Sequence, residues 1–368
     1  MAVFEIINEG WISRRRLEEG GRTGAPNCVL TSGGALICTY IIQSAMGSND
    51  FVPHLARSHD GGVTWQQYGP IWPDLAAAWS ILVTGSRAPN GDLYLFGSRC
   101  PIDVPEETFW CEETQGLKQN ELVWSRSSDD GATWTEPAVI PMPVAGAAEA
   151  PAPMCVSRNG RWLCCYSPYN TFDSSLTVDR SKAVILVSDD EGQTWQHGHM
   201  LSYHEPETGS AVAAVTELSD GRFLGAGWHL HLADKQDYPN GFALSNDGWH
   251  WEPTGSTGVM GQSVGLAPLP DGRVLMSFTQ RKHAEIGIGI AVASPESGDF
   301  GLQHKEIVWA AERAMEHNSS GDHGDWLDFA FGMPALTLLD ADTVLMGFWL
   351  HQADGRGARY VRLRMNDS

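Results

Sequence analysis

The sequence has no apolar run approaching the roughly 18 residues that a membrane-spanning helix needs. Its first residues, MAVFEIINEGWISRRR, lack the basic start, long apolar stretch and small-residue cleavage site of a secretory signal. Basic residues are also scarce, since 24 Lys and Arg stand against 45 Asp and Glu, for a formal net charge of −21. That charge disfavours nucleic-acid phosphates and anionic membrane surfaces as partners. We therefore expect a protein that binds neither.

Cysteine is present in an odd number, seven, with no spacing typical of a metal site. This pattern favours reduced thiols in a cytoplasm and predicts no cofactor, although secretion stays open if a signal peptide has been removed. Cys28 and Cys38 lie symmetrically about one glycine turn, and Cys155 and Cys164 about another. We expect each pair to face across two strands as small buried apolar residues rather than as disulfides.

Long helical patterns are few, whereas 40 glycines and 15 tryptophans point to short strands joined by tight turns. Six segments repeat an apolar run, a turn and a second apolar run, as in CVLTSGGALICTY and GLAPLPDGRVLMSF. Their turns centre on Gly34, Gly91, Gly160, Gly221, Gly272 and Asp340–Asp342. Asn-Gly or Asp-Gly between apolar runs is a strong hairpin signal, and a spacing of about 50 to 70 residues suits one four-stranded sheet per repeat.

The six hairpins predict an all-β chain, with residues 1–368 forming a single six-bladed β-propeller domain. The N-terminal VFEIINEG is expected to pair with ARYVRLRM in the last blade, which closes the ring and removes free sheet edges.

A second repeat is a short acidic turn that ends in tryptophan. Its copies are SHDGGVTW at 58–65, SSDDGATW at 127–134, SDDEGQTW at 188–195 and a degenerate fourth, SNDGWHW, at 245–251. It follows each hairpin where the third strand of a blade should turn into the fourth. Asp60, Asp129 and Asp189 are expected to accept bonds from turn N–H groups, while glycine takes a positive φ. The tryptophan is expected to pack under the next sheet. We interpret this repeat as structural rather than catalytic.

The turn S-x-D-x-G-x-T-W resembles the Asp box of the sialidase superfamily, and the resemblance covers about residues 20–360. It implies a six-bladed propeller whose pocket lies where innermost strands start and second strands end. The resemblance is specific for fold and much less so for activity, because Asp boxes also occur in lyases and non-enzymatic receptors.

Residue by residue, the resemblance implies that Arg22 and Arg281 match two of the arginines that bind a substrate carboxylate. Asp50 matches the loop aspartate, and Glu207 matches the glutamate that begins the fourth blade. Two positions depart from the pattern: Trp228 or His229 stands where another arginine belongs, and Phe331 stands where the tyrosine nucleophile belongs. Phenylalanine cannot attack an anomeric carbon, so an ordinary sialidase mechanism is not expected.

The exo-arabinanases of the wider fold group are similar in using two carboxylates from neighbouring blades. Glu149 and Glu207 stand at equivalent strand starts, so we expect them to act as a catalytic pair, with Asp50 as a further carboxylate. The ligand is then expected to be an oligosaccharide or glycoside with an acidic or hydroxyl-rich sugar. Its binding residues are expected to be Arg22, Arg281, Trp79, Trp228, His229, His231, Trp349 and His351.

Three alternatives stay open. Histidines and arginines favour a lyase acting on a uronic acid, with His229 and His231 on one face of a strand. The same histidines with nearby carboxylates are compatible with a metal site. A non-catalytic glycan-binding propeller is the third alternative. The stretch SGDHGDWLDF at 320–329 is either a loop over the pocket or a solvated connection, and the oligomeric state is not predicted.

Overall fold

In the computed structural model, residues 3–16, 19–149, 152–283, 285–317, 319–353 and 355–366 are described. Within these ranges the regular structure consists of β-strands and short 3₁₀ turns, with no α-helix. None of the described helices is long and apolar enough to cross a membrane.

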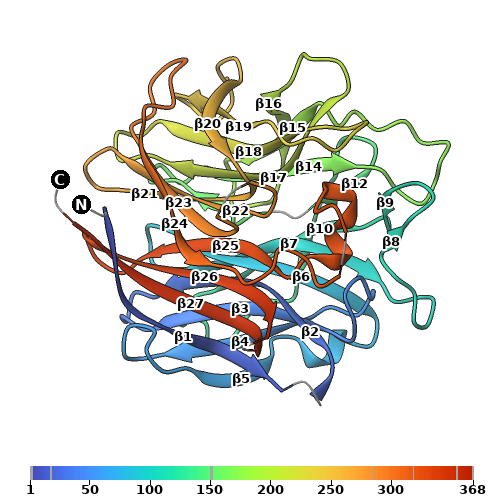
Figure 1. Cartoon of the computed structure of the whole chain (residues 1–368), viewed down its shortest axis with the longest axis horizontal. Coiled ribbons are helices and arrows are strands. Elements are labelled where there is room, and N and C mark those ends of the chain that lie inside the picture. Colours follow the sequence, from blue (N-terminus) through green and yellow to red (C-terminus); the bar gives the residue numbers. More distant parts are fainter. Residues whose placement is uncertain are drawn as a thin grey trace.

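Six antiparallel sheets follow one another along the chain (Figure 1). Blade 1 holds β2(Arg22–Leu30), β3(Leu36–Gln43), β4(Val52–Ser58) and β5(Gln66–Pro70), and blade 2 holds β6(Trp79–Arg87), β7(Leu93–Pro101), β10(Glu121–Ser127) and β11(Ala138–Ile140). Blade 3 holds β12(Ala147–Glu149), β13(Cys155–Val156), β14(Trp162–Tyr169), β15(Lys182–Ser188) and β16(Gln196–Ser202). Blade 4 holds β17(Thr208–Glu217), β18(Phe223–His231), β19(Pro239–Ser245) and β20(Gly255–Met260).

Blade 5 holds β21(Gln262–Pro268), β22(Val274–Gln280), β23(Gly287–Ala293) and β24(Leu302–Ala310). Blade 6 holds β25(Phe331–Leu338), β26(Thr343–Gln352), β27(Gly355–Met365) and the N-terminal β1(Phe4–Arg15). The remaining elements are a small ribbon of β8(Trp110–Cys111) with β9(Gly116–Leu117) and the 3₁₀ segments η2(Pro73–Leu75) and η3(His323–Asp328). The predicted six-bladed propeller is confirmed.

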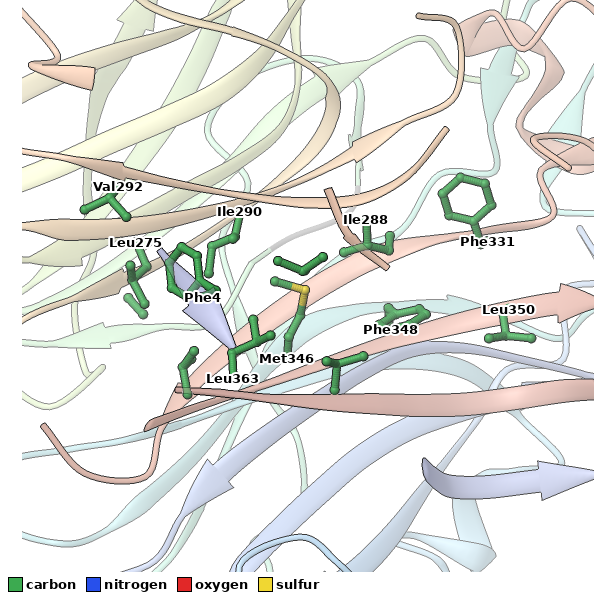
Figure 2. Close-up of a cluster of buried hydrophobic side chains, with 14 of the residues drawn as sticks. Phe4, Leu275, Ile288, Ile290, Val292, Phe331, Met346, Phe348, Leu350 and Leu363 are labelled. Atoms are coloured by element: carbon green, nitrogen blue, oxygen red, sulfur yellow. The ribbon is translucent and has the colours of Figure 1, made fainter. Parts of the chain in front are cut away.

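The ring closes as the sequence predicted, because β1 pairs antiparallel with β27 from Phe4↔Met365 to Arg15↔Arg356. The two ends of the chain consequently lie near each other at one edge of the molecule (Figure 1). Phe4 also packs into the apolar layer between blades 5 and 6, together with Leu275, Ile290 and Leu363 (Figure 2). Burying these side chains supplies the main favourable free energy that holds one blade on the next.

The Asp boxes lie between the third and fourth strands of blades 1 to 4, as expected. In the first box, Asp60 accepts hydrogen bonds from the backbone N–H groups of Val63 and Thr64 and from the Thr64 hydroxyl. These bonds, led by the Thr64 hydroxyl, lower the pKa of Asp60 to about 2. Asp129 repeats the arrangement with Thr133.

In the third box the prediction named the wrong aspartate. Asp190, not Asp189, accepts the bonds of Thr194, because it stands two residues after Ser188 as the motif requires. Asp189 pairs instead with Arg161.

The tryptophans of the boxes pack against the preceding blade, not the next one. Trp65 of blade 1 lies 6.5 Å from the ring of Tyr360 in blade 6, and Trp134 of blade 2 packs on Val29, Ile37 and Leu55 of blade 1. Each box therefore fixes a turn and wedges its blade against a neighbour.

All seven cysteines are free thiols. Cys28 pairs directly opposite Cys38, as predicted. The second predicted pair is wrong, because Cys155 lies opposite Leu163. Cys155 instead shares an apolar cluster with Cys165, whose side chain leaves the strand on the face opposite to that of Cys164.

Candidate functional site

A cavity of about 190 Å³ lies on the propeller axis at one mouth of the central channel. Its wall combines the first and second strands of the blades, as expected for this fold, with two long loops. Eight aromatic side chains line it: Phe51, Phe109, Trp110, Tyr169, Trp228, Trp326, Phe329 and Trp349. The polar groups are few and include Gln43, Lys118, Asn120, Glu149 and Arg281. Aromatic walls with a few placed polar groups are typical of small-ligand sites.

Glu149 is the predicted carboxylate that lines the cavity. Glu149 is the last residue of β12. The Asn120 side chain holds this strand by bonding both backbone groups of Ala148: it donates to the carbonyl at 2.9 Å and accepts from the N–H at 2.8 Å. The Glu149 Oε2 atom accepts a hydrogen bond of 2.9 Å from the backbone N–H of Val212 in the neighbouring blade. Backbone and carboxylate are thus both fixed.

The donor to Glu149 comes from a β-bulge. The pairing of β17 with β18 shifts between Ala211 and Ala213, and Val212 between them has φ 45°. A β-branched residue in the left-handed region is strained, and such strain concentrates at functional sites. Ala25, Ser263 and Met333 form matching bulges in three other innermost strands and also line the cavity. The bulges therefore shape its floor.

Tyr169 ends β14 on the same face as Glu149 and also lines the cavity. The guanidinium of Arg180 lies 3.9 Å from the centre of its ring. Burial raises the pKa of Tyr169 to about 12, against the lowering effect of Arg180. The phenol therefore keeps its proton at neutral pH and can serve as a hydrogen-bond donor.

Two of the predicted binding residues, Trp228 and Trp349, line the cavity as well. The indole N–H of Trp228 donates to Asp237 at 2.9 Å, which fixes the plane of the ring. Trp349 packs with Phe329 and Met315.

Arg281 reaches the cavity, and both of its terminal nitrogens donate to the protein, whereas its Nε has no hydrogen-bond partner among the described residues. It donates to the side-chain oxygen of Gln262 and to the main-chain carbonyl of Phe331, and it stacks 3.7 Å from the ring centre of Phe329. Burial lowers its pKa to about 9, which leaves it cationic at neutral pH. The guanidinium is held by the protein itself.

Arg22 is not among the lining residues, and it forms an ion pair of 2.9 Å with Glu316. The other oxygen of Glu316 lies 2.9 Å from Nδ1 of His351, whose side chain has no exposed surface. Burial lowers the pKa of His351, while the bond to Glu316 opposes that effect. Arg22 and His351 thus bind the two oxygens of one carboxylate, that of Glu316.

The remaining predicted residues also lie outside the lining. Glu207 precedes β17 with φ 56°, and its carboxylate, 68% exposed, lies 3.8 Å from His231. Asp50 accepts from the Ser44 N–H, and Trp79 stacks on Arg99 at 4.0 Å. The structure therefore does not place Glu207 or Asp50 in the cavity beside Glu149.

The histidines are not part of the cavity lining either. His229 and His231 share a strand face, as expected, since both contact Tyr238. His229 stacks 4.0 Å from Tyr203, and His231 bonds Asp234 at 2.7 Å. In the described part of the chain, no group of three or more His, Cys, Asp or Glu residues has the geometry of a metal site.

Of the two loops that complete the cavity, sequence reasoning missed one and left the other as one of two alternatives. The loop between β7 and β10 supplies Phe109 and Trp110, and the loop 311–330 between β24 and β25 supplies Trp326 and Phe329. Trp326 lies 4.9 Å from Phe109 and 5.7 Å from Trp110, so the loops meet. Of the two readings of SGDHGDWLDF, the loop over the pocket is the correct one. One sequence signal could have predicted these loops: both are longer than a hairpin turn requires, and both contain aromatic residues.

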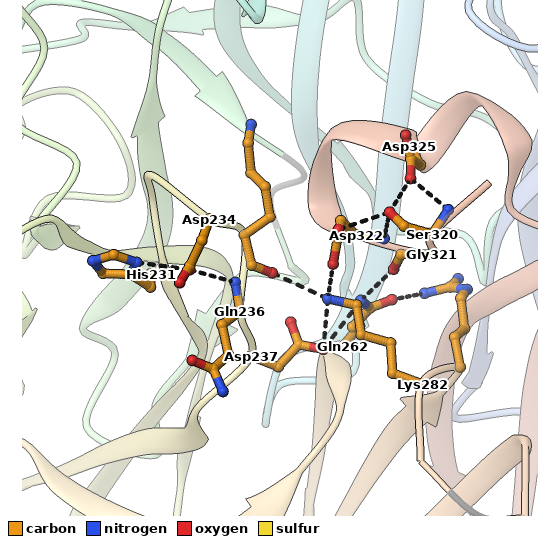
Figure 3. A network of polar contacts seen from close by, with 12 residues as sticks. His231, Asp234, Gln236, Asp237, Gln262, Lys282, Ser320, Gly321, Asp322 and Asp325 are labelled. Atoms are coloured by element: carbon orange, nitrogen blue, oxygen red, sulfur yellow. Dashed lines mark hydrogen bonds and ion pairs between the residues drawn. The ribbon is translucent and has the colours of Figure 1, made fainter.

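Asp237, also missed, is a buried carboxylate behind Trp228. A network of polar contacts joins it to Gln262, Lys282 and the segment around Asp322 (Figure 3). It stands in the connection between β18 and β19, and no motif marks it.

Solved structures with a similar fold include a protein of unknown function, a sialidase and an α-L-arabinanase. A protein of unknown function from Dyadobacter fermentans is 17% identical over all of both chains, with a TM-score of 0.76. The NanB sialidase of Streptococcus pneumoniae is 12% identical over 99% of this chain and 71% of its own, with a TM-score of 0.63. An α-L-arabinanase of Penicillium chrysogenum, solved with arabinobiose, is 16% identical over 98% of this chain and 99% of its own, also with a TM-score of 0.63. These identities support a shared fold alone.

The sequence itself matches a family model described as a BNR repeat-like domain, over residues 86–307. That range covers more than half of the 368 residues and includes three of the four acidic turns. The chain belongs to the BNR repeat-like domain family.

Proposed function

We propose that this protein is an exo-acting glycoside hydrolase that binds an uncharged, hydroxyl-rich sugar in the cavity at the channel mouth. The observation that carries the proposal is the Glu149 carboxylate, fixed by the Val212 N–H inside a wall of aromatic rings. Aromatic faces suit the apolar faces of a sugar, and a carboxylate is the group that glycosidases use at the anomeric centre.

The contacts of the arginines favour an uncharged sugar over sialic acid. Arg22 is neutralised by Glu316, and Arg281 is bound by Gln262 and the Phe331 carbonyl. A substrate carboxylate there would have to share these guanidinium groups with their protein partners. The tyrosine nucleophile of sialidases is replaced by Phe331, which is fully buried and packs on Trp309.

In this proposal Glu149 acts at the anomeric carbon, as nucleophile or as the base that activates water. Glu207, at the start of the neighbouring blade, is the second carboxylate and protonates the leaving oxygen from the rim. The separation of the two carboxylates in the substrate complex decides between retention, at about 5–5.5 Å, and inversion, at about 6.5–9.5 Å. The two meeting loops close one side of the cavity, which suits the end of a chain rather than its middle.

The test is turnover of a panel of aryl glycosides and oligosaccharides, followed by mass spectrometry. The expected result is release of a monosaccharide with gain of water, reduced at least about a hundredfold in Glu149→Gln and in Glu207→Gln with folding unchanged. Full activity in Glu149→Gln would reject the proposal. A product lacking water and absorbing in the ultraviolet would indicate the lyase, and tight glycan binding without any product would indicate the binding module.

A further inference from the structure

Asp237 is a buried acidic residue that makes contacts on three sides. Its side chain is only 4% exposed. One oxygen accepts from the Trp228 indole N–H at 2.9 Å; the other accepts from the Gln262 amide at 3.3 Å and lies 3.6 Å from the Lys282 ammonium. A buried carboxylate is tolerated only when such donors replace water, so the three partners and Asp237 depend on one another.

Two of these contacts lead to the wall of the cavity. Trp228 lines the cavity directly, and its ring plane is set by the bond to Asp237. Gln262 donates to Asp237 through its amide nitrogen and accepts from Arg281 through its oxygen. The position of Arg281 therefore depends indirectly on Asp237, through Gln262.

The third contact leads to the loop 311–330 (Figure 3). Lys282 forms an ion pair with Asp322 in that loop, and the amide of Gln262 donates a second bond, of 3.1 Å, to the Gly321 carbonyl. Trp326, four residues further on, is the side chain of the loop that meets Phe109 and Trp110. One carboxylate thus joins the tryptophan wall and the loop.

We propose that Asp237 is a positioning residue that couples the orientation of Trp228 to the closed position of the loop 311–330. The coupling works through shared donors. The Lys282 ammonium contacts both Asp237 and Asp322 and also donates to the Lys235 carbonyl at 3.0 Å. The Gln262 amide donates both to Asp237 and to the loop. Its consequence for sugar binding rests on the function proposed above, whereas the coupling itself does not.

The test uses the full-length protein labelled with 5-fluorotryptophan. The fluorine resonances of Trp228 and Trp326 are assigned among the 15 tryptophans by single Trp→Phe variants. Asp237→Asn keeps the shape but presents an amide to the donors of Gln262 and Lys282, so both resonances should move. Lys282→Gln removes the ammonium that contacts Asp322 and Asp237 but keeps the bond from the Trp228 indole N–H to Asp237, so Trp326 should move while Trp228 stays.

The matched control is Asp234→Asn, on the same connection. Asp234 bonds His231 and the Gln236 N–H instead of the wall or the loop, so neither resonance should move. The proposal fails if Asp237→Asn moves neither resonance, if it moves Trp228 alone, or if Asp234→Asn moves both. Lys282→Gln keeps the test decisive if Asp237→Asn does not fold, because an unmoved Trp326 resonance there rejects the coupling.

With a substrate from the turnover panel, Asp237→Asn should raise KM at least about tenfold, since a buried hydrogen-bond network is lost, while kcat falls less. The fluorine measurement needs no substrate. Failure of the glycosidase proposal and failure of the coupling are therefore separate outcomes.

Discussion

Arg22 illustrates how a residue with the right identity and place can be used for structure instead of binding. Sequence position put it at the start of β2, which is where the structure has it. Its partner Glu316, however, lies in the loop 311–330, nearly 300 residues later. No local sequence pattern predicts a contact between these two residues. The ion pair joins the first blade to the loop 311–330 and fixes one terminal nitrogen of the guanidinium.

We predict that Glu316→Gln destabilises the protein by about 3 kcal/mol, because it leaves Arg22 without its counter-charge in a largely buried site. Burial lowers the pKa of Arg22, and the charge of Glu316 opposes that effect. Chemical denaturation should report the loss. A change below about 0.5 kcal/mol would mean that Arg22 is free to serve a substrate after all.

At the scale of single elements, β12 is three residues long and yet carries Glu149. It keeps its place because the Asn120 side chain imitates a neighbouring strand, bonding both the N–H and the carbonyl of Ala148. Without that clamp the strand end would rely on its pairing with β14 alone.

Asn120→Ala should therefore lower kcat at least about tenfold and stability by about 2 kcal/mol, because two buried backbone groups lose their partner. Gln119→Ala is the matched control. It removes a bond to the Gly146 carbonyl at the far end of the same segment and should change kcat less than about threefold. Equal effects in both variants would argue against a specific role for the clamp.

The Asp boxes are expected to stabilise the fold in a pH-dependent way. The pKa of Asp60 is lowered to about 2 by the Thr64 hydroxyl and N–H, so the box stabilises the fold fully above the unfolded pKa near 3.9 and loses this contribution as pH falls towards 2. Asp60→Asn should lower Tm by about 2 °C at pH 7. The gap from wild type should narrow below pH 4 and close near pH 2.

Calorimetry across that range measures the gap, and turnover per folded molecule should stay unchanged. In the third box the same behaviour belongs to Asp190→Asn, with Asp189→Asn following the weaker pattern of a surface ion pair. A gap that does not depend on pH would contradict the hydrogen-bond explanation.

At the scale of the whole molecule, the sequence was enough to predict the number of blades, the turn positions and the closure by β1. These features depend on local turn chemistry and on an alternation of apolar residues that repeats six times. The strand starts at Arg22, Trp79, Gln262 and Phe331 were predicted to the residue. The two strand starts expected at Glu149 and Glu207 were less accurate, because Glu149 ends β12 and Glu207 directly precedes β17.

The site was predicted less completely, for a physical reason. Bulges such as the one at Val212 decide which strand-end side chain faces the propeller axis. The counter-charge of a residue such as Arg22 comes from a distant part of the ring. Glu149, Trp228, Arg281 and Trp349 were predicted as site residues and line the cavity, whereas Glu207, Asp50, Arg22, Trp79 and the three histidines do not. Asp237 and the loop tryptophans follow from long-range packing that no motif records.

The central claim is that the aromatic cavity around Glu149 is where a glycosidic bond is cleaved. The most direct measurement is a crystal structure of Glu149→Gln with the substrate found in the turnover panel. We predict one terminal sugar ring between Trp228 and Trp349, its anomeric carbon beside residue 149 and the rest of the substrate leaving past Glu207. A sugar bound outside this cavity, with no part of the substrate inside it, would contradict the claim.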